Sequence, residues 1–318
     1  MGNSAERSLA VLLPYGFSAA ERYPSAWFLD GYFGNGISMI SDPGPLDQSF
    51  CERIMLLQKE GIMPRALSIF PDCSTRWGGS QYIDSSVNGP FLSHLVDELV
   101  PFVDSVFPTW TEANQRIITG HSSGGYGALM VALLRPGVFG SVIASAADSA
   151  FELSMRPEFN IAAITIKKAG SIKQFLTQFF AQNQPSKSSK NDFMTLMTLC
   201  MASCYSPNPK SSDLIELPFL LESLEIRDDI WNQWLAWDPL NIMMKNAKNL
   251  KSLRHLHLDV GSEDEFCAQF GHRAMAQILL NAEIPHLSTE FNGGHYGTSA
   301  RYRFRFEQLT AVWSKSKT

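Results

Sequence analysis

Short apolar runs that favour β-structure alternate along most of this chain with segments whose apolar residues recur at helical spacing. Strands that alternate with helices are typical of a parallel sheet covered by helices. The sequence therefore predicts an α/β fold with a mostly parallel central sheet flanked by helices. The expected strands are residues 9–13, 26–29, 66–70, 116–119, 141–144, 255–260 and 287–291. The expected helices around them are residues 46–60, 92–107, 124–134, 266–282 and 301–313.

Residues 151–250 interrupt this alternation. They contain helical patterns at 172–182, 192–204 and 229–237, a polar break at 184–191, and no convincing strand. We expect a helical insertion, or lid, at 151–250 within a single domain that spans residues 1–318. A separate small helical domain is the alternative, since a segment of this length can build a core of its own.

Charge and composition disfavour several classes of partner. The chain has a formal net charge of −5 and no long Lys/Arg cluster, so no nucleic acid is expected as a partner. No apolar run approaches the roughly 18 residues of a membrane span, and the first residues lack a secretory pattern, which makes a cytoplasmic location the default expectation. The five cysteines are odd in number and irregularly spaced, so we expect neither a disulfide framework nor a metal site.

The segment Gly120-His-Ser-Ser-Gly124 matches the pattern G-x-S-x-G between an expected strand and an expected helix. In that context the central serine lies on a sharp turn, and its hydroxyl projects from the end of the sheet. The helix N-terminus behind it adds partial positive charge where an oxyanion would form. Ser122 is therefore the candidate nucleophile, and a plain strand-turn-helix connection is the alternative.

A serine nucleophile needs a base and an acid that orients the base, here in the chain order Ser, Asp, His. Of the later histidines, His295 lies in a glycine-rich loop directly after the last expected strand, where it can reach the edge of the sheet. The acid candidates follow the preceding strand. Asp264 is the first choice and Glu263 the second, because a carboxylate in that loop can accept from the imidazole Nδ1–H.

An oxyanion hole needs two N–H donors. One expected donor is the amide of Ser123, which directly follows the nucleophile. The other is the amide of Tyr32, in the loop after the strand at 26–29. Gly31 is expected to permit the close approach of that backbone.

Together these residues resemble the Putative esterase (esterase D-like) family of α/β-hydrolases, which includes S-formylglutathione hydrolases, feruloyl and enterochelin esterases, and mycolyltransferases. The resemblance covers most of the chain. It is carried by Leu29-Asp-Gly, Gly-His-Ser-Ser-Gly-Gly-Tyr-Gly-Ala-Leu at the serine turn, Gly261-x-x-Asp264-Glu-Phe, Gly294-His295 and Arg301-Tyr302. It implies the α/β-hydrolase fold, with Ser122 as nucleophile, Asp264 as acid, His295 as base, and Tyr32 and Ser123 as oxyanion donors.

Two departures from the family pattern bear on the substrate. Many members have His-Gly where this chain has Asp30-Gly31, and the helical insertion is longer than in compact members. The departures affect the expected substrate class and leave the expected reaction unchanged.

The substrate-binding side is predicted from aromatic and basic residues near the expected catalytic edge, where ligands bind in such sheets. Arg76 is expected to meet an acidic substrate group or to pair with Asp72. The tryptophans at 231, 234 and 237 recur at helical spacing, as an aromatic wall or as packing between insertion and core. The expected substrate contacts are Arg76, Trp77, Tyr82, Trp234, Trp237 and Tyr296.

The sequence predicts a serine carboxylesterase that hydrolyses short-chain carboxylic esters, or thioesters, through an acyl-enzyme. Its partner is a small-molecule ester or thioester, and no cofactor is expected. The alternatives are an acyltransferase that uses an alcohol or sugar acceptor, a thioesterase like S-formylglutathione hydrolase, and a non-catalytic binding protein on the same scaffold. Assembly as a homodimer is left open.

Overall fold

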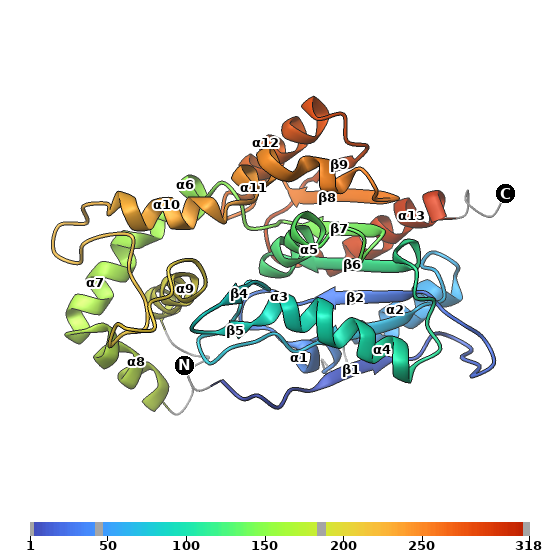
Figure 1. The fold of residues 1–318 in the computed structure, drawn as a ribbon, viewed down its shortest axis with the longest axis horizontal. Helices are drawn as coiled ribbons and strands as arrows, with labels where there is room; N and C mark the ends of the chain where they lie inside the picture. The colour runs from blue at the N-terminus through green and yellow to red at the C-terminus, as the bar shows by residue number, and fades with distance from the viewer. Residues whose placement is uncertain (1–2, 42–46, 183–188, 314–318) are drawn as a thin grey trace.

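The computed structural model describes residues 3–41, 47–182 and 189–313, and it contains a seven-stranded sheet in the order β1-β3-β2-β6-β7-β8-β9 (Figure 1). Neighbouring strands are parallel except for β1, which pairs with β3 in the antiparallel direction. The predicted α/β architecture is confirmed. The strands are β1 (Leu9–Leu12), β2 (Ser25–Leu29), β3 (Leu67–Pro71), β6 (Arg116–His121), β7 (Ser141–Ser145), β8 (His255–Gly261) and β9 (Leu287–Phe291).

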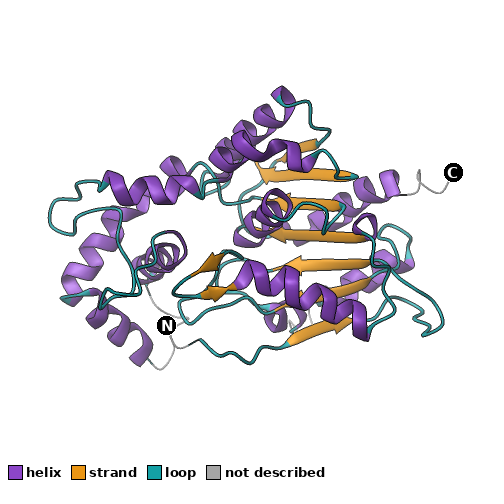
Figure 2. Ribbon diagram, viewed as in Figure 1, coloured by secondary structure: helices purple, strands orange, loops and turns teal. Residues whose placement is uncertain are grey.

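Helices cover both faces of this sheet (Figure 2). Alternate residues of β2 enter different cores, with Trp27 and Leu29 on one face and Ala26 and Phe28 on the other. The first face packs against α4 (Val100–Val106), α5 (Ser123–Leu134) and α12 (Ala268–Asn281). The second face packs against α2 (Phe50–Lys59) and α13 (Arg301–Trp313).

Two predicted helices differ from those observed. The predicted helix at 46–60 begins at Phe50, where Ser49 and Glu52 form a capping box, and Leu46 lies outside the described residues. The predicted helix at 92–107 consists of α3 (Phe91–Ser93), a π-helical segment (His94–Leu99) and α4. Pro101 explains the interruption, because it has no N–H to donate to the preceding turn. Unpredicted elements here are α1 (Gly36–Ile40) and the hairpin of β4 (Asp84–Ser85) and β5 (Gly89–Pro90).

The insertion at 151–250 is helical, and its described residues form no strand of a sheet. In Figure 1 the helices α7 to α10 lie beyond the ends toward which the parallel strands point. The insertion therefore stands over the carboxyl edge of the sheet. Its helices are α6 (Phe151–Ser154), α7 (Phe159–Ala169), α8 (Ile172–Ala181), α9 (Lys190–Tyr205), α10 (Asp228–Ala236) and α11 (Pro239–Asn246).

The insertion shares a hydrophobic core with the sheet. Phe151 and Tyr205 of the insertion pack against each other with ring centroids 5.2 Å apart, and both rings contact Tyr126 of α5. Asp238 joins the two ends of the insertion, because its carboxylate accepts from the amides of Phe151 and Leu240. This shared core supports the single-domain interpretation, which stays a prediction.

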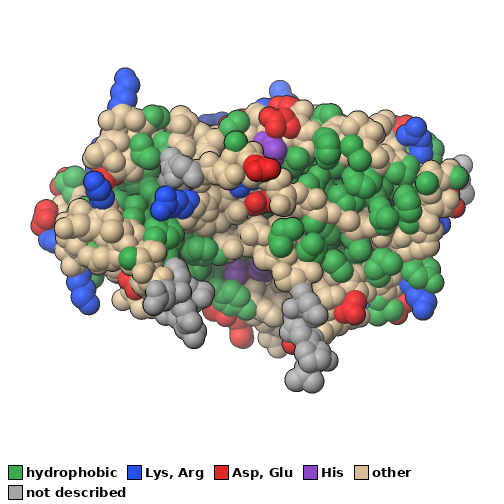
Figure 3. Space-filling view, turned by 90° about the horizontal axis from the view of Figure 1, so that it is seen from below, with side chains coloured by type: hydrophobic (Ala, Val, Ile, Leu, Met, Phe, Trp, Pro, Cys, Tyr) green, Lys and Arg blue, Asp and Glu red, His purple; other side chains and the backbone are tan. Residues whose placement is uncertain are grey.

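One side of the molecule exposes hydrophobic side chains. Figure 3 shows them on the right half of the face seen there, over the end of the molecule that holds β1 and α4. Leu13 and Tyr15, which follow β1, are exposed, as are Phe102 and Val106 of α4. The homodimer remains a prediction. Among the described residues, no helix combines the length and apolar character that crossing a bilayer requires.

Candidate active site

Ser122 lies on the sharp turn between β6 and α5, with backbone angles φ 57° and ψ −125°. This conformation is strained for a residue with a side chain, at a cost of about 1–3 kcal/mol. The two motif glycines make the turn possible. A Cβ at Gly120 would collide with Gly124, and a Cβ at Gly124 would collide with the carbonyl of Leu29. The Ser122 amide donates to the carbonyl of Ser145 at 2.9 Å, which holds the turn to β7.

Asp264 and His295 are joined by a hydrogen bond of 2.7 Å between a carboxylate oxygen and the ring Nδ1. Asp264 follows β8 and His295 follows β9, so two adjacent parallel strands deliver both side chains to the carboxyl edge of the sheet. Both residues are buried. The structure thus brings together the base and acid that the sequence analysis selected, and Nε2 is the ring nitrogen left for the nucleophile.

The environment of Asp264 favours its ionised form. Burial alone raises the pKa of this carboxyl, but hydrogen bonds from the His295 ring and from the amides of Phe266 and Ala268 outweigh burial and lower the pKa below its ordinary value. The ionised carboxylate accepts from Nδ1–H. This fixes the tautomer and orientation of the imidazole.

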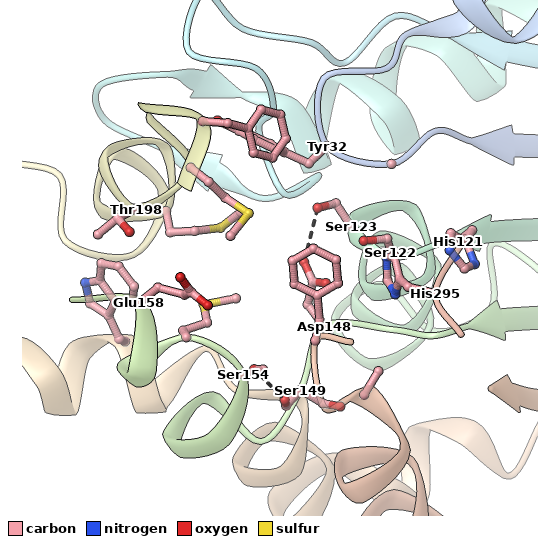
Figure 4. Close-up of a pocket in the computed structure, with 18 of the residues that line it drawn as sticks. Tyr32, His121, Ser122, Ser123, Asp148, Ser149, Ser154, Glu158, Thr198 and His295 are labelled. Atoms are coloured by element: carbon pink, nitrogen blue, oxygen red, sulfur yellow. Dashed lines mark hydrogen bonds between the residues drawn. The ribbon is translucent and has the colours of Figure 1, made fainter. Parts of the chain in front are cut away.

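Ser122 and His295 line the same pocket (Figure 4). The Ser122 hydroxyl makes no side-chain hydrogen bond with a residue in the described part of the chain. Catalytic hydrogen bonds are often long before substrate binds and tighten in the complex. The pocket is therefore lined by both the candidate nucleophile and the candidate base, and the candidate base is hydrogen-bonded to the candidate acid.

Two backbone amides, in the loop after β2 and at the start of α5, have no hydrogen-bond acceptor among the described residues. Neither the Tyr32 amide nor the Ser123 amide donates to another described residue. The Tyr32 hydroxyl donates to the carbonyl of Trp77 at 2.8 Å and so anchors the loop. The backbone at Gly31 lies near the serine turn, as expected, but a side chain at this position would also fit. A Cβ there would lie 3.6 Å from the His121 carbonyl oxygen, an ordinary contact.

The family of this chain agrees with the arrangement of Ser122, Asp264 and His295 at the edge of the sheet. The sequence model of the family described as Putative esterase matches residues 3–309. The chain belongs to this family. It is therefore an esterase-family hydrolase, as the sequence analysis predicted from the serine turn and its surroundings. No curated protein sequence matches the chain.

Solved structures with the same fold include a ferulic acid esterase of Anaeromyces mucronatus, a fluorophosphonate-binding serine hydrolase of Staphylococcus aureus and an S-formylglutathione hydrolase of Agrobacterium tumefaciens. The ferulic acid esterase has a TM-score of 0.53 and 16% identity, and the match covers 95% of this chain and 84% of that one. The fluorophosphonate-binding hydrolase has a TM-score of 0.56 and 14% identity, with 97% of this chain and 95% of that one covered. The S-formylglutathione hydrolase has a TM-score of 0.52 and 15% identity, with 97% of this chain and 88% of that one covered. Because the sequence identities are this low, the structural similarity establishes the α/β-hydrolase fold and nothing beyond it.

The pocket of the esterase includes only two of the six predicted substrate contacts, Trp234 and Tyr296. Arg76, Trp77, Tyr82 and Trp237 do not line it, which corrects that prediction. Trp77 and Tyr82 are buried in the core, and the Tyr82 hydroxyl donates to the carbonyl of Asp30. The Arg76 guanidinium lies over the Phe180 ring at 5.4 Å, while Asp72 instead pairs with Arg7 at 3.7 Å.

The tryptophans of α10 serve mainly as packing. Trp231 donates from Nε1 to Glu152 at 2.7 Å, and Trp234 donates to the Ser206 hydroxyl at 2.8 Å. Both rings contact Phe159 of α7. Trp234 also lines the pocket, so both interpretations of the repeat apply to this residue.

The sequence analysis assigned no role to four titratable residues around the site. His121 lies with its ring 4.6 Å from that of His295, and burial followed by the His295 charge lowers its pKa to about 3. Glu265 accepts from the His295 amide at 2.6 Å. Asp148 and Glu158 line the pocket. Asp148 follows β7, so the rule that selected Asp264 after β8 could also have selected Asp148.

No group of three or more His, Cys, Asp or Glu side chains among the described residues could hold a metal ion.

Proposed function

We propose that this chain is a serine carboxylesterase that hydrolyses short-chain esters of small molecules through an acyl-enzyme. The observation that carries the proposal is the hydrogen bond between Asp264 and the His295 ring, beside a pocket that His295 shares with the strained Ser122. Acyl transfer by this route needs one nucleophile, one base and two amide donors. All of them are residues of this chain.

In the first half of the reaction, Ser122 Oγ attacks the acyl carbon while His295 Nε2 takes its proton. Asp264 stabilises the imidazolium that forms, without itself taking the proton. The amides of Tyr32 and Ser123 donate to the negative oxygen of the tetrahedral intermediate. The intermediate collapses, the carbon–oxygen bond to the alcohol breaks, and the leaving alcohol takes the proton from His295.

In the second half, water attacks the acyl-enzyme carbonyl and His295 takes a proton from it. The second tetrahedral intermediate breaks its bond to Ser122 Oγ, which regains the proton from His295. The products are a carboxylic acid and the free enzyme. Thioester cleavage and transfer to an alcohol or sugar acceptor use the same acyl-enzyme, and product analysis with each substrate or acceptor distinguishes them.

Substitution of the nucleophile tests this function. Ser122→Ala is expected to keep the fold and to lose about 10³-fold or more of the kcat for p-nitrophenyl acetate, as removal of a catalytic serine does. A fluorophosphonate probe should label Ser122 in the wild type, located by peptide mass spectrometry. Ser105→Ala, at an exposed position of α4, is the control and should retain both properties. A folded Ser122→Ala protein with wild-type turnover would exclude the mechanism.

A further inference from the structure

The pocket at Ser122 is lined by two carboxylates. Its described lining residues include Asp148 and Glu158 together with two histidines, and none of these described residues is a lysine or an arginine. One of the histidines, His121, is kept neutral at ordinary pH by burial, which lowers its pKa to about 3. A cavity of about 200 Å³ thus combines a nucleophile with two acidic groups.

Glu158 lies on the insertion's side of this pocket. Figure 4 shows it near Thr198, with Ser122 and His295 on the opposite side. One of its carboxylate oxygens is buried and has no hydrogen-bond partner among the described residues. A buried acceptor without a partner is unfavourable, because it has lost its hydrogen bonds to water. Such a group lining a substrate pocket is a position where a ligand can supply the missing partner.

The nearest cation does not neutralise Glu158. Burial raises the pKa of this carboxyl and the charge of Lys190 lowers it, with burial the larger effect. Lys190 is exposed, does not line the pocket, and forms no ion pair with Glu158 among the described salt bridges. Glu158 is therefore available to a charged group of the substrate.

Asp148 adds a second carboxylate nearer the nucleophile. It accepts from Gln81 Nε2 at 2.8 Å and from the Ser123 hydroxyl at 3.1 Å. Both of these donors are neutral. Burial raises the pKa of Asp148, and the hydrogen bond from Gln81 and the charge of His295 lower it, with burial the larger effect. An anionic substrate group would meet repulsion from both ends of the pocket.

Aromatic side chains also line the pocket that holds Glu158. Phe159, Phe193 and Trp234 line the same pocket, and the rings of Phe159 and Trp234 pack with centroids 5.6 Å apart. The face of an aromatic ring attracts a cation. Trp234 and Phe159 are almost fully buried, whereas Phe193 is only partly buried and is the most accessible of these three rings. Carboxylates and aromatic rings in one pocket are the combination that binds alkylammonium groups.

We propose, on the basis of the esterase function above, that the preferred substrate carries an ammonium group. Glu158 and the neighbouring rings bind this cation while the ester carbonyl lies at Ser122. The same charges disfavour substrates with carboxylates, glutathione thioesters included.

Two pairs of esters that differ only in charge test this proposal. The first pair is the p-nitrophenyl ester of γ-trimethylammoniobutyrate and its carbon isostere, in which a tert-butyl group replaces the ammonium. The second pair is acetylcholine and its tert-butyl isostere, which places the charge on the alcohol. In at least one pair, kcat/KM is expected to be about tenfold or more higher for the cationic ester.

Two variants test whether Glu158 causes the preference for cationic esters. Glu158→Gln keeps the shape of the side chain and should lower the ratio of kcat/KM for the preferred cationic ester to kcat/KM for its isostere about tenfold. Glu225→Gln removes the same charge from an exposed position of the insertion and should change neither rate. Equal loss in both variants would attribute the preference to overall charge and overturn the role of Glu158.

The results separate this inference from the proposed function. Turnover of the neutral isosteres without preference for either cationic ester overturns the ammonium specificity and leaves the serine mechanism standing. A folded protein that hydrolyses none of the four esters and resists the fluorophosphonate probe contradicts both. A preference that disappears only in Glu158→Gln supports both.

Discussion

At the scale of single residues, the site depends on which of three consecutive carboxylates reaches His295. Asp264 is buried and bonds to the ring, whereas Glu263 is exposed. Glu265 is also exposed, and its carboxylate accepts from the His295 amide, so it holds the backbone of the loop. Adjacent residues on a turning loop point in different directions, and only one of the three can face the imidazole.

Asp264→Asn is expected to lower kcat by about 10³- to 10⁴-fold with little change in KM, because the amide stabilises the wrong imidazole tautomer. Steady-state kinetics on p-nitrophenyl acetate measure the effect. Glu263→Gln, the matched substitution at the alternative acid, should leave kcat unchanged. If instead Glu263→Gln is the inactive variant, the choice of acid is wrong.

At the scale of elements, the turn between β6 and α5 requires the strand and helix to approach closely. The helix N-terminus packs against the loop after β2, and glycine at 124 leaves room for the carbonyls of Leu29 and Asp30. The close packing explains why the turn can hold Ser122 in a strained conformation. The packed elements around the turn restrict its backbone to this conformation.

Gly124→Ala is expected to lower the free energy of unfolding by about 1–3 kcal/mol, because the added methyl group must displace backbone that cannot move freely. Chemical denaturation followed by circular dichroism measures the change. Gly31→Ala is the stability control, since its Cβ would make only ordinary contacts, the shortest at 3.6 Å. A Gly124→Ala protein as stable as Gly31→Ala would refute this account of the turn.

At the scale of the whole molecule, a buried ionic network ties the C-terminal helix to the sheet. Asp259 of β8 accepts from Arg305 of α13 at 2.7 Å and from Arg301 at 2.5 Å, and also from Thr289 of β9. Asp259 and Arg305 are almost fully buried. Burial raises the pKa of Asp259, but the two arginines outweigh it and hold the pKa below the ordinary 3.8.

Asp259→Asn is expected to destabilise the protein by about 3–5 kcal/mol at neutral pH, because it leaves buried guanidinium groups unpaired. A lowered pKa in the folded state means that this carboxylate stabilises the fold above its unfolded pKa. The contribution is lost as the pH falls through the folded value. Denaturation curves should therefore show a smaller difference in the free energy of unfolding between wild type and variant at acidic pH than at neutral pH.

The predicted strands and the serine turn come from local patterns. A short apolar run such as the one at residues 141–144 depends on near neighbours in the chain, so each strand could be located without the fold. Short insertion helices such as α6 and α11 were missed, since four to eight residues give little periodicity. The direction of β1 was not specified, because pairing joins it to a strand more than fifty residues away.

The sequence by itself determined the α/β class, the position of Ser122, and a short set of candidates for its base and acid. Only the tertiary structure decided which side chains share the pocket. It buried Trp77 and Tyr82, turned Arg76 onto Phe180, and placed Glu158 of the insertion across from Ser122. The physical reason is the distance along the chain over which each interaction acts. Strand, helix and turn preferences act between neighbours in the chain, whereas a pocket is formed by segments that meet only when the core packs.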